Sequence, residues 1–438
     1  MKFSVGQCAN LVGRVFSYRI VFRLAALAAV FFLLQITTPP MAQAQVADGT
    51  PSDRQTIELL LQRIDRLEAR VAQLESAKQP PPAAAPSQPS AAAAAPETVA
   101  QEAAPEHPEG ERMDVSKTLM KIRGFGDVTF HGDNRHGDNT SFTLGQLNLF
   151  ITSDISERFK FLGELVFEAD SHNSFGAEFE RYLLQYSRND YFNVSIGRYH
   201  SAIGYYNTAY HHSTWLQTAT GRPLLFEFED RGGPLPVHNV GVSVTGLVPS
   251  GRLGLHYVAE VGNGRASLSP GSEPVQNVVD ENNGKSFNLA FLVKPEAVRG
   301  LQAGFSAYHD GLKPAGLANV NETILAAHAV LVRPNFEWLN EALLIRHAVD
   351  GSRTFNTPGF YTQVSKRFAS YRPYFRYQYI NEPDAEPVFP QLGRREGPSV
   401  GLRFDPSESV AIKLQYDYTM QRHLPATNGL ALQFGFTF

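Results

Sequence analysis

The last nine residues of the chain, "LALQFGFTF", alternate between apolar residues and small or polar ones. Leu430, Leu432, Phe434, Phe436 and Phe438 share one parity, and Ala, Gln, Gly and Thr occupy the other. Successive side chains of a strand point to opposite faces, so this pattern predicts a strand with one apolar face. A half-buried strand of a soluble protein gives the same pattern, and the rest of the chain has to decide between the two.

Alternating segments of this kind recur from Met113 onward, separated by clusters of turn-forming residues. The number of predicted strands is about sixteen, an even number, as in bacterial outer-membrane barrels. The pair at 323–348 has the weakest pattern and resembles helix as well as strand. The predicted strands lie near 119–131, 141–153, 159–168, 178–188, 191–199, 238–248, 252–262, 285–294, 301–310, 323–333, 335–348, 358–367, 371–381, 395–404, 409–419 and 429–438.

The connections between these segments alternate between tight turns and long links. The tight turns lie at 156–157, 189–190, 249–251, 295–300, 334–335, 369–370 and 406–409, and the links between them are long, polar and rich in Gly. Outer-membrane barrels have short turns on the periplasmic side and long loops outside, whereas a soluble sandwich has no reason to sort its loops in this way. The fold class expected is therefore all-β, a transmembrane antiparallel barrel.

Charged residues of the predicted strands fall on one parity. In "VAIKLQYDYT", residues 410–419, Ile412 and Leu414 would face lipid while Lys413 and Asp417 would face a water-filled lumen. Rings of Arg or Lys favour anions, but facing carboxylates could pair with them and leave weak selectivity. By parity the expected pore-lining residues are Lys121, Arg123, Arg181, Arg346, Arg372, Arg376, Arg403 and Lys413, with Glu164 and Glu168.

The N-terminal quarter of the chain reads as a series of separate segments. Arginines precede the apolar block "LAALAAVFFLL", and Ala42-Gln43-Ala44 offers a cleavage site, which is typical of a secretory signal. A stretch rich in Pro and Ala is too poor in large apolar residues to fold and predicts an extended linker. The expected segments are a signal peptide at 1–44, a mature N-terminus at 45–52, a coiled coil at 53–78, a linker at 79–112 and the barrel at 113–438.

In the predicted coiled coil, apolar residues occupy both core positions of each heptad, a (the first) and d (the second). Its expected core is Ile57, Leu60, Ile64, Leu67, Val71 and Leu74. Ile or Val at the first position with Leu at the second favours a dimer, whereas "RIDRLE" and "RVAQLE" resemble an Arg-and-Glu motif of short trimeric coils. The repeated motif favours a homotrimer. An amphipathic helix lying on its own domain is the alternative, although it would need a wider apolar face.

Composition excludes several classes of protein. The formal net charge of −4 gives no reason to expect nucleic acid as a partner. The only cysteine, Cys8, lies in the predicted signal, so we expect no disulfide and no thiolate metal site in the mature chain. No internal apolar run approaches the ~20 residues that a spanning helix needs.

The chain resembles trimeric porins of the phosphate-selective porin O and P type, or a related carboxylate-conducting porin. The resemblance rests on the order of signal, coil, linker and barrel and on "SIGRYHSAIGYYN" at 195–207, which is similar to that family's Gly-Arg-aromatic stretch ahead of its third loop. Strict parity would direct Arg198 toward lipid unless a bulge follows Gly197. The ending resembles the terminal strand of outer-membrane proteins, which implies that Phe438 is read by the barrel-assembly machinery.

The resemblance also implies that the longest connection, roughly 200–237, is a third external loop that folds into the barrel and narrows the pore. The alternative is a loop that packs outside or covers a trimer contact. The polar residues expected at the constriction are His211, His212, Arg222, Glu227, Glu229, Asp230 and Arg231.

The sequence therefore predicts an outer-membrane porin for passive diffusion of small hydrophilic solutes, with a preference for anions such as phosphate or carboxylates as a refinement. The coil and the linker could extend into the periplasm and contact the cell wall, so the alternative is a tethering role. No spacing of Ser and His singles out a catalytic triad, so an enzyme such as an outer-membrane phospholipase is the weaker alternative. "HGDNRHGDN" at 131–139 offers His and Asp side chains, but these residues also form ordinary turns, and we expect no metal or cofactor.

Overall fold

The computed structural model describes residues 120–135, 139–169, 173–210, 213–266 and 278–438. The predicted signal peptide, coiled coil and linker lie outside the described residues. No helix in the described part of the chain is long and apolar enough to cross a membrane.

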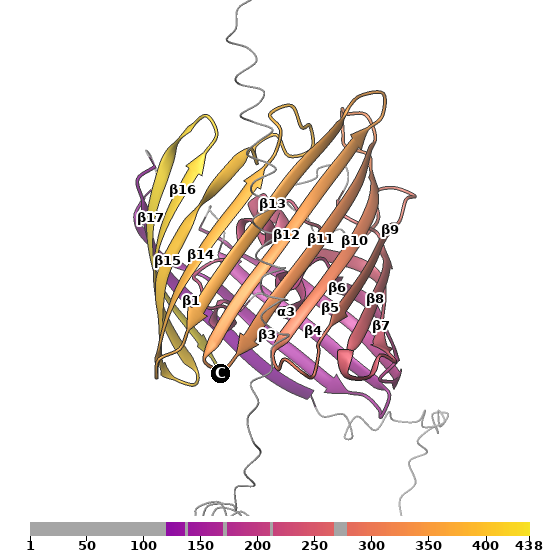
Figure 1. Cartoon of the computed structure of the whole chain (residues 1–438), viewed down its shortest axis with the longest axis horizontal. Helices are drawn as coiled ribbons and strands as arrows, with labels where there is room; N and C mark the ends of the chain where they lie inside the picture. Colours follow the sequence, from indigo (N-terminus) through magenta and orange to yellow (C-terminus); the bar gives the residue numbers. More distant parts are fainter. Residues whose placement is uncertain (1–119, 136–138, 170–172, 211–212, 267–277) are drawn as a thin grey trace, which may run out of the picture. The chain divides into compact units, whose positions relative to one another are not determined.

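The described residues form one antiparallel sheet that closes on itself (Figure 1). Its strands are β1 (Met120–Asp133), β2 (Ser141–Leu144), β3 (Gln146–Asp154), β4 (Phe159–Ala169), β5 (Phe175–Asn189), β6 (Phe192–His200), β7 (His238–Val248), β8 (Leu255–Gly262), β9 (Ser286–Val293), β10 (Leu301–Leu312), β11 (Val320–Arg333), β12 (Phe336–Val349), β13 (Thr354–Lys366), β14 (Tyr371–Asn381), β15 (Arg394–Ser407), β16 (Val410–Gln421) and β17 (Leu424–Thr437). β2 and β3 are consecutive segments that both pair with β1, and they count as one strand of the barrel. The ring therefore has 16 strands.

Each strand pairs with its neighbours in sequence, and β17 returns to pair with β1. The register of this closure places Phe436 opposite Gly126 and Phe434 opposite Val128. Backbone hydrogen bonds of 2.8 and 2.9 Å join Gly124 and Phe438 beyond the last paired residues. A ring without edges pairs every strand on both sides, which is what a sheet in hydrocarbon requires. The predicted barrel is confirmed, and the segment at 323–348 is strand.

The outer surface of the ring is apolar. On β16, Leu414 and Tyr416 are about half exposed, whereas Lys413 and Gln415, which alternate with them, are buried inside. The same alternation continues on β17, where Leu430, Phe434 and Phe436 face outward. Exposed aromatic residues such as Phe179 and Tyr182 continue this surface around the barrel. A band of this kind is suited to lipid, because the hydrocarbon of a bilayer replaces the core that these side chains lack.

The terminal aromatic rings cover two glycines of β1. A Cβ atom added to Gly124 would lie 2.2 Å from the Phe438 ring, and one added to Gly126 would lie 2.6 Å from the Phe436 ring. The two rings stack with centroids 6.4 Å apart. Glycine at these two positions therefore lets the last aromatic residues lie flat against the first strand at the seam of the ring.

The connections follow the predicted alternation at one end of the barrel and only in part at the other. The tight turns between β3 and β4, β5 and β6, β11 and β12, and β13 and β14 all occur. On the opposite side, 201–237, 263–285 and 382–393 are long, whereas the links at 350–353 and 422–423 are short. The expectation of uniformly long loops on that side is wrong at these last two links.

The expected position of Arg346 is also wrong. On β12, Ile345 and His347 are buried inside, and Arg346 lies between them in the outer row that contains Ala342 and Leu344. The reason is that Leu339, Leu343 and Ile345 face inward and pack on a loop inside the barrel. Because both faces of this strand are apolar, hydrophobicity does not tell which of them meets lipid.

Arg198 does not lie among the lipid-facing residues. Its side chain is buried, with the guanidinium donating a hydrogen bond of 3.1 Å to the Glu180 carbonyl and lying 3.8 Å from the Glu180 carboxylate. The preceding residue, Gly197, has φ of +135°, and a Cβ atom there would lie 2.0 Å from the carbonyl oxygen of Tyr182. This irregular backbone resolves the conflict of parity that the sequence raised at Arg198.

We expect Gly197→Ala to destabilise the barrel, because the new Cβ meets backbone and the φ angle suits only glycine. The cost should be at least ~1–3 kcal/mol. Gly176→Ala on neighbouring β5 is the matched control, since nothing lies within 4 Å of its Cβ position. Thermal unfolding followed by far-UV circular dichroism in detergent would compare the two, and equal midpoints would contradict the account of Gly197.

Candidate functional site: the third loop and the passage beside it

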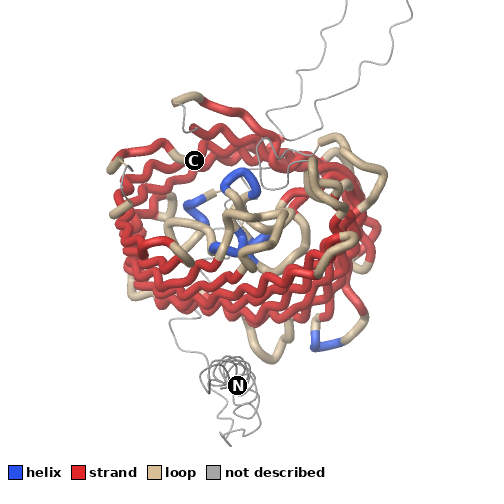
Figure 2. The backbone as a smooth tube through the Cα atoms, turned by 90° about the horizontal axis from the view of Figure 1, so that it is seen from above, coloured by secondary structure: helices blue, strands red, loops and turns tan. Residues whose placement is uncertain are grey.

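The connection between β6 and β7 comprises residues 201–237, and its described residues, 201–210 and 213–237, lie inside the ring of strands (Figure 2). We call this segment the third loop. It contains the short helices α3 (Tyr206–Ala209), η2 (Thr214–Leu216), η3 (Leu224–Phe226) and η4 (Glu229–Arg231). The alternative that this loop packs outside the barrel is therefore excluded.

One side of the third loop is held by a hydrophobic core. Ile203, Leu225 and Phe226 are at most 1% exposed. They belong to one cluster with the inward-facing residues of five strands, β10 to β14, which include Tyr308, Ile324, Leu339, Tyr361 and Ile380. Burying a side chain such as Leu or Phe contributes roughly 1.5–3 kcal/mol. The loop is thus packed against this wall like part of a protein core.

The third loop is also held by cations of β14, β15 and β16 that donate to its carbonyl oxygens. Lys413 Nζ donates to Thr214 O at 2.5 Å and to Ala219 O at 3.0 Å. Arg403 Nη1 donates to Trp215 O at 2.8 Å and Gln217 O at 2.9 Å. Arg376 Nη1 donates to Gly221 O at 2.8 Å. We call Arg376, Arg403 and Lys413 the carbonyl clamp.

Two carboxylates of β12 hold the beginning and the middle of the loop. Glu341 accepts hydrogen bonds from the backbone N–H groups of Tyr205 and Tyr206 at 2.5 and 2.9 Å. Glu337 accepts from the hydroxyl groups of Tyr210 and Thr218, both at 3.2 Å. The loop is therefore held at several points along its length by the consecutive strands β10 to β16.

The charged residues within the third loop are largely satisfied internally. The Arg222 guanidinium lies 4.2 Å above the Phe228 ring and donates to the carbonyl of Phe226. Burial lowers its pKa from the usual value. Burial opposes ionisation of Glu229, but the charge of nearby His238 and its hydrogen bonds outweigh this and hold the pKa of Glu229 below its usual value. These side chains stabilise the shape of the loop.

A second connection, residues 382–393, adds to the same core. Val388, Phe389 and Leu392 are buried in the cluster with the third loop. Glu386 accepts from the backbone N–H of Phe389 at 2.7 Å and lies 2.7 Å from Nδ1 of His347 on β12. Both inward segments therefore pack against the wall formed by β10 to β14.

The opposite side of the lumen keeps a polar cavity of about 370 Å³ between the third loop and β1 to β3 and β17. We call it the side passage. Amide and hydroxyl groups dominate its lining, and two acidic and two basic residues balance each other. The polar lining residues are Asp127, Thr129, Thr143, Gln146, Thr214, Gln217, Thr220, Arg222, Glu227, Arg231 and Gln433.

Nine of the ten expected pore-lining residues face inward, but most of them are engaged. Besides the carbonyl clamp, Glu164 accepts from Arg181 Nε at 2.5 Å and from Asn148 at 2.6 Å. Arg372 donates to Pro334 O at 2.9 Å. Glu168 accepts from Gln146 at 2.7 Å and from Arg231 at 3.2 Å. These hydrogen bonds hold the wall and the third loop in place.

The two remaining pore-lining candidates, Lys121 and Arg123, lie at the beginning of β1. Arg123 has its guanidinium 5.4 Å from the Trp215 ring of the third loop. Lys121 is exposed and lies 3.9 Å from Asp154.

The expected constriction residues have different fates. Glu227 and Arg231 line the side passage, and Arg222 does so while being mostly buried. Glu229 is buried against His238. His211 and His212 lie outside the described residues, as does the side chain of Asp230.

Sequence reasoning missed several neutral residues of the site. Gln415 accepts from the Thr220 N–H at 3.1 Å, and Gln378 accepts from the Leu224 N–H at 3.1 Å. Gln433 donates to Asp127 at 3.2 Å inside the side passage. Their inward parity was readable, but an amide in a strand carries no charge signal that would have drawn attention to it.

The described part of the chain contains no group of three or more His, Cys, Asp or Glu side chains that could hold a metal ion. Within the repeat at 131–139, His131 and Asp133 lie 3.9 Å apart, and Arg135 also binds Asp133. Residues 136–138 of that repeat are outside the described residues.

Comparison with solved structures places this barrel among outer-membrane proteins of the same architecture. An anion-selective porin from Comamonas acidovorans superposes with a TM-score of 0.52 at 12% identity, over 74% of this chain and 100% of that one. OmpF of Salmonella typhi in complex with daunomycin gives 0.52 at 10% identity, over 73% and 97% of the two chains. The trimer form of in-vitro folded OmpT, an outer membrane protein of Vibrio cholerae, gives 0.51 at 10% identity, over 73% and 99%.

No protein-family description and no curated protein sequence matches the chain. At identities this low the likeness establishes the fold alone. The conclusion from geometry and comparison together is a closed porin-like barrel with an inwardly folded third loop.

Proposed function

We propose that this chain is a porin of the bacterial outer membrane, which lets small hydrophilic solutes diffuse through the side passage. The observation that carries the proposal is the third loop, which is anchored inside a lipid-suited barrel and leaves a polar cavity along one wall. Amide and hydroxyl groups along a cavity favour water inside it, whereas an interior filled with apolar side chains excludes water. The porin-like fold supports this proposal.

Weak charge selectivity follows from how the inward cations are used. The three cations of the carbonyl clamp donate hydrogen bonds to backbone oxygens of the third loop. In the side passage, Arg222 and Arg231 are balanced by Asp127 and Glu227. We therefore infer a channel for neutral and charged small solutes, in which a preference for anions such as phosphate or carboxylates depends on the more exposed Arg231, whose guanidinium also binds Glu168.

The remaining parts of the proposal concern assembly. We propose a homotrimer in the outer membrane, with lipid around its outer surface and Phe438 as the residue read by the assembly machinery. The exposed apolar band supports contact with lipid, and the backbone pairing of Phe438 with Gly124 places the last residue at the seam of the ring. The trimer form of the similar Vibrio cholerae structure supports the homotrimer. No enzymatic activity is proposed.

Tethering by the N-terminal segments is a second candidate role that accompanies the pore. The order of coiled coil at 53–78 and Pro/Ala-rich linker at 79–112 is the observation that favours it. Deleting residues 51–112 should leave single-channel conductance unchanged and reduce cosedimentation of the protein with isolated cell wall. Unchanged cosedimentation would count against the tether and leave the pore untouched.

Lys413→Met should loosen the third loop, because the carbonyl oxygens of Thr214 and Ala219 lose their donor inside the barrel. Leaving them unpaired should cost ~2–5 kcal/mol, and the channel should show a higher and noisier conductance in planar bilayers. Lys121→Met is the matched control, since that lysine is exposed and its ion pair should contribute no more than ~1 kcal/mol. Identical conductance traces for the two variants would refute the role of the clamp.

Arg231→Gln should reduce the permeability of anions relative to cations, because it removes the more exposed cation of the side passage. A single charge in a wet channel contributes up to ~1 kcal/mol at close range, so the permeability ratio should fall by up to roughly fivefold. Arg346→Gln, on the outer face, should leave the ratio unchanged. Reversal potentials in a salt gradient measure both, and a larger effect of Arg346 would overturn the assignment of faces.

A further inference from the structure

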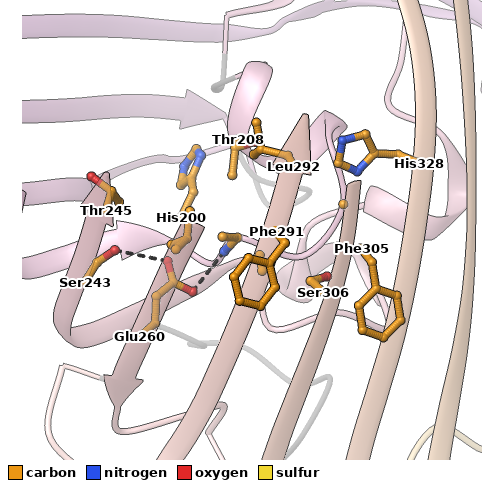
Figure 3. Close-up of a pocket in the computed structure, with 14 residues that line it drawn as sticks. His200, Thr208, Ser243, Thr245, Glu260, Phe291, Leu292, Phe305, Ser306 and His328 are labelled. Atoms are coloured by element: carbon orange, nitrogen blue, oxygen red, sulfur yellow. Dashed lines mark hydrogen bonds between the residues drawn. The ribbon is translucent and has the colours of Figure 1, made fainter. Parts of the chain in front are cut away.

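A second hollow, of about 280 Å³, lies in the inner wall formed by β7 to β11, next to the beginning of the third loop (Figure 3). The pairing of these strands places Thr245, Val258, Ala290 and Ser306 side by side in one row across the wall. The next row contains Leu292, Gly304 and His328. Because Ala290, Gly304 and Ser306 are small, the wall is recessed between larger neighbours.

A buried carboxylate lies at the edge of this hollow. Glu260 is only 4% exposed and accepts hydrogen bonds from Ala202 N–H at 3.0 Å, Asn288 Nδ2 at 2.8 Å and Ser243 Oγ at 3.3 Å. Figure 3 shows Glu260 reaching toward Ser243 beneath His200. No ion pair with Glu260 occurs among the described residues. A buried carboxylate is normally paired with a cation, so this environment is incomplete as it stands.

Unpartnered oxygen atoms near Glu260 point to the same deficit. Ser306 lines the hollow and is 3% exposed, and its hydroxyl has no hydrogen-bond partner in the described residues. Asn288, which donates to Glu260, keeps its own carbonyl oxygen Oδ1 buried without a donor. Buried polar atoms are nearly always satisfied in folded proteins. Glu260 and Ser306 line the hollow, whereas Asn288 does not, so a ligand in the hollow that brings several N–H or O–H donors would suit the first two.

A divalent metal ion does not suit this environment. Calcium takes six to eight oxygen ligands and usually several carboxylates, whereas the hollow has one carboxylate and no metal-ligand cluster is found among the described residues. An ammonium group is better matched, because it has three donors, no acceptor and one charge. The apolar lining from Val258, Ala290 and Leu292 provides room for a short hydrocarbon chain.

We propose that this hollow is a binding site for small primary alkylamines, with the ammonium group held by Glu260 and the hydroxyl of Ser306 and the alkyl chain on the apolar lining. Its volume is below the usual range of ~300–1,000 Å³ for pockets that hold drug-sized ligands, which restricts it to short chains. His328 limits the site on one side, since its ring lies over Gly304 and pairs with Gln302 at 3.1 Å. Binding here does not depend on conduction through the side passage.

Isothermal titration of the folded full-length protein in detergent with butylammonium chloride tests the proposal. Saturable binding is expected, with 1-butanol and butyrate of the same chain length binding at least about tenfold more weakly. Glu260→Gln keeps the size of the side chain and removes its charge, and should weaken butylammonium binding by at least about tenfold. Ala290→Leu keeps the carboxylate, fills the hollow and should weaken binding to a similar degree.

Glu396→Gln on β15 is the matched control for loss of one carboxylate, and should bind butylammonium like the natural sequence. Far-UV circular dichroism confirms that each variant is folded. Absence of saturable binding to the unaltered protein, equal binding of 1-butanol, or normal binding by both folded variants would each overturn the proposal. Conductance measured on the same preparations separates the two ideas: a protein that conducts but does not bind the amine contradicts only this inference.

Discussion

The structure depends on the need to pair every backbone N–H and C=O group in a strand that faces hydrocarbon. Because water is unavailable there as a substitute partner, an open sheet edge is excluded, and the last strand must pair with the first. The pairing of β17 with β1 satisfies this need, and the glycines under Phe436 and Phe438 let the two ends meet closely. Once the ring is closed, its strands divide all side chains into an outer and an inner set.

Closure creates an interior that is too large to be filled by the strands alone. The third loop fills one side with an apolar core against β10 to β14 and is also held by hydrogen bonds from β14 to β16. Cations suit the second task because a short loop segment without regular structure presents carbonyl oxygens that need donors. Lys413 and Arg403 each satisfy two such oxygens, which a neutral side chain with one donor does not do.

This use of charge changes how the inner wall should be interpreted. A count of inward-facing Arg and Lys residues suggests a basic channel, but Arg376 and Lys413 are almost fully buried beneath the loop. The charges that remain near the side passage are few and nearly balanced. At the same time, the carboxyl group of Glu260 is buried on the opposite wall without a cationic partner in the described residues. The inner surface therefore differs in character from one wall to the next.

The sequence by itself determined the strands and, through them, the fold. Alternation in segments such as 410–419 has the period of a strand, and this local property survives in any environment. It also placed Arg372, Arg403 and Lys413 on the inner face correctly, because charge in hydrocarbon is costly and marks the wet side of a strand.

Only the tertiary structure decided the inner face of β12 and the partners of the inward cations. Arg346 was misplaced because Leu339 and Ile345 face inward against a loop that lies far away in sequence, so both faces of the strand are apolar. Likewise, Lys413 meets Thr214 across 199 positions of chain. Such contacts arise when the ring closes around the loop, and no local pattern of residues encodes which carbonyl oxygen a given lysine will reach.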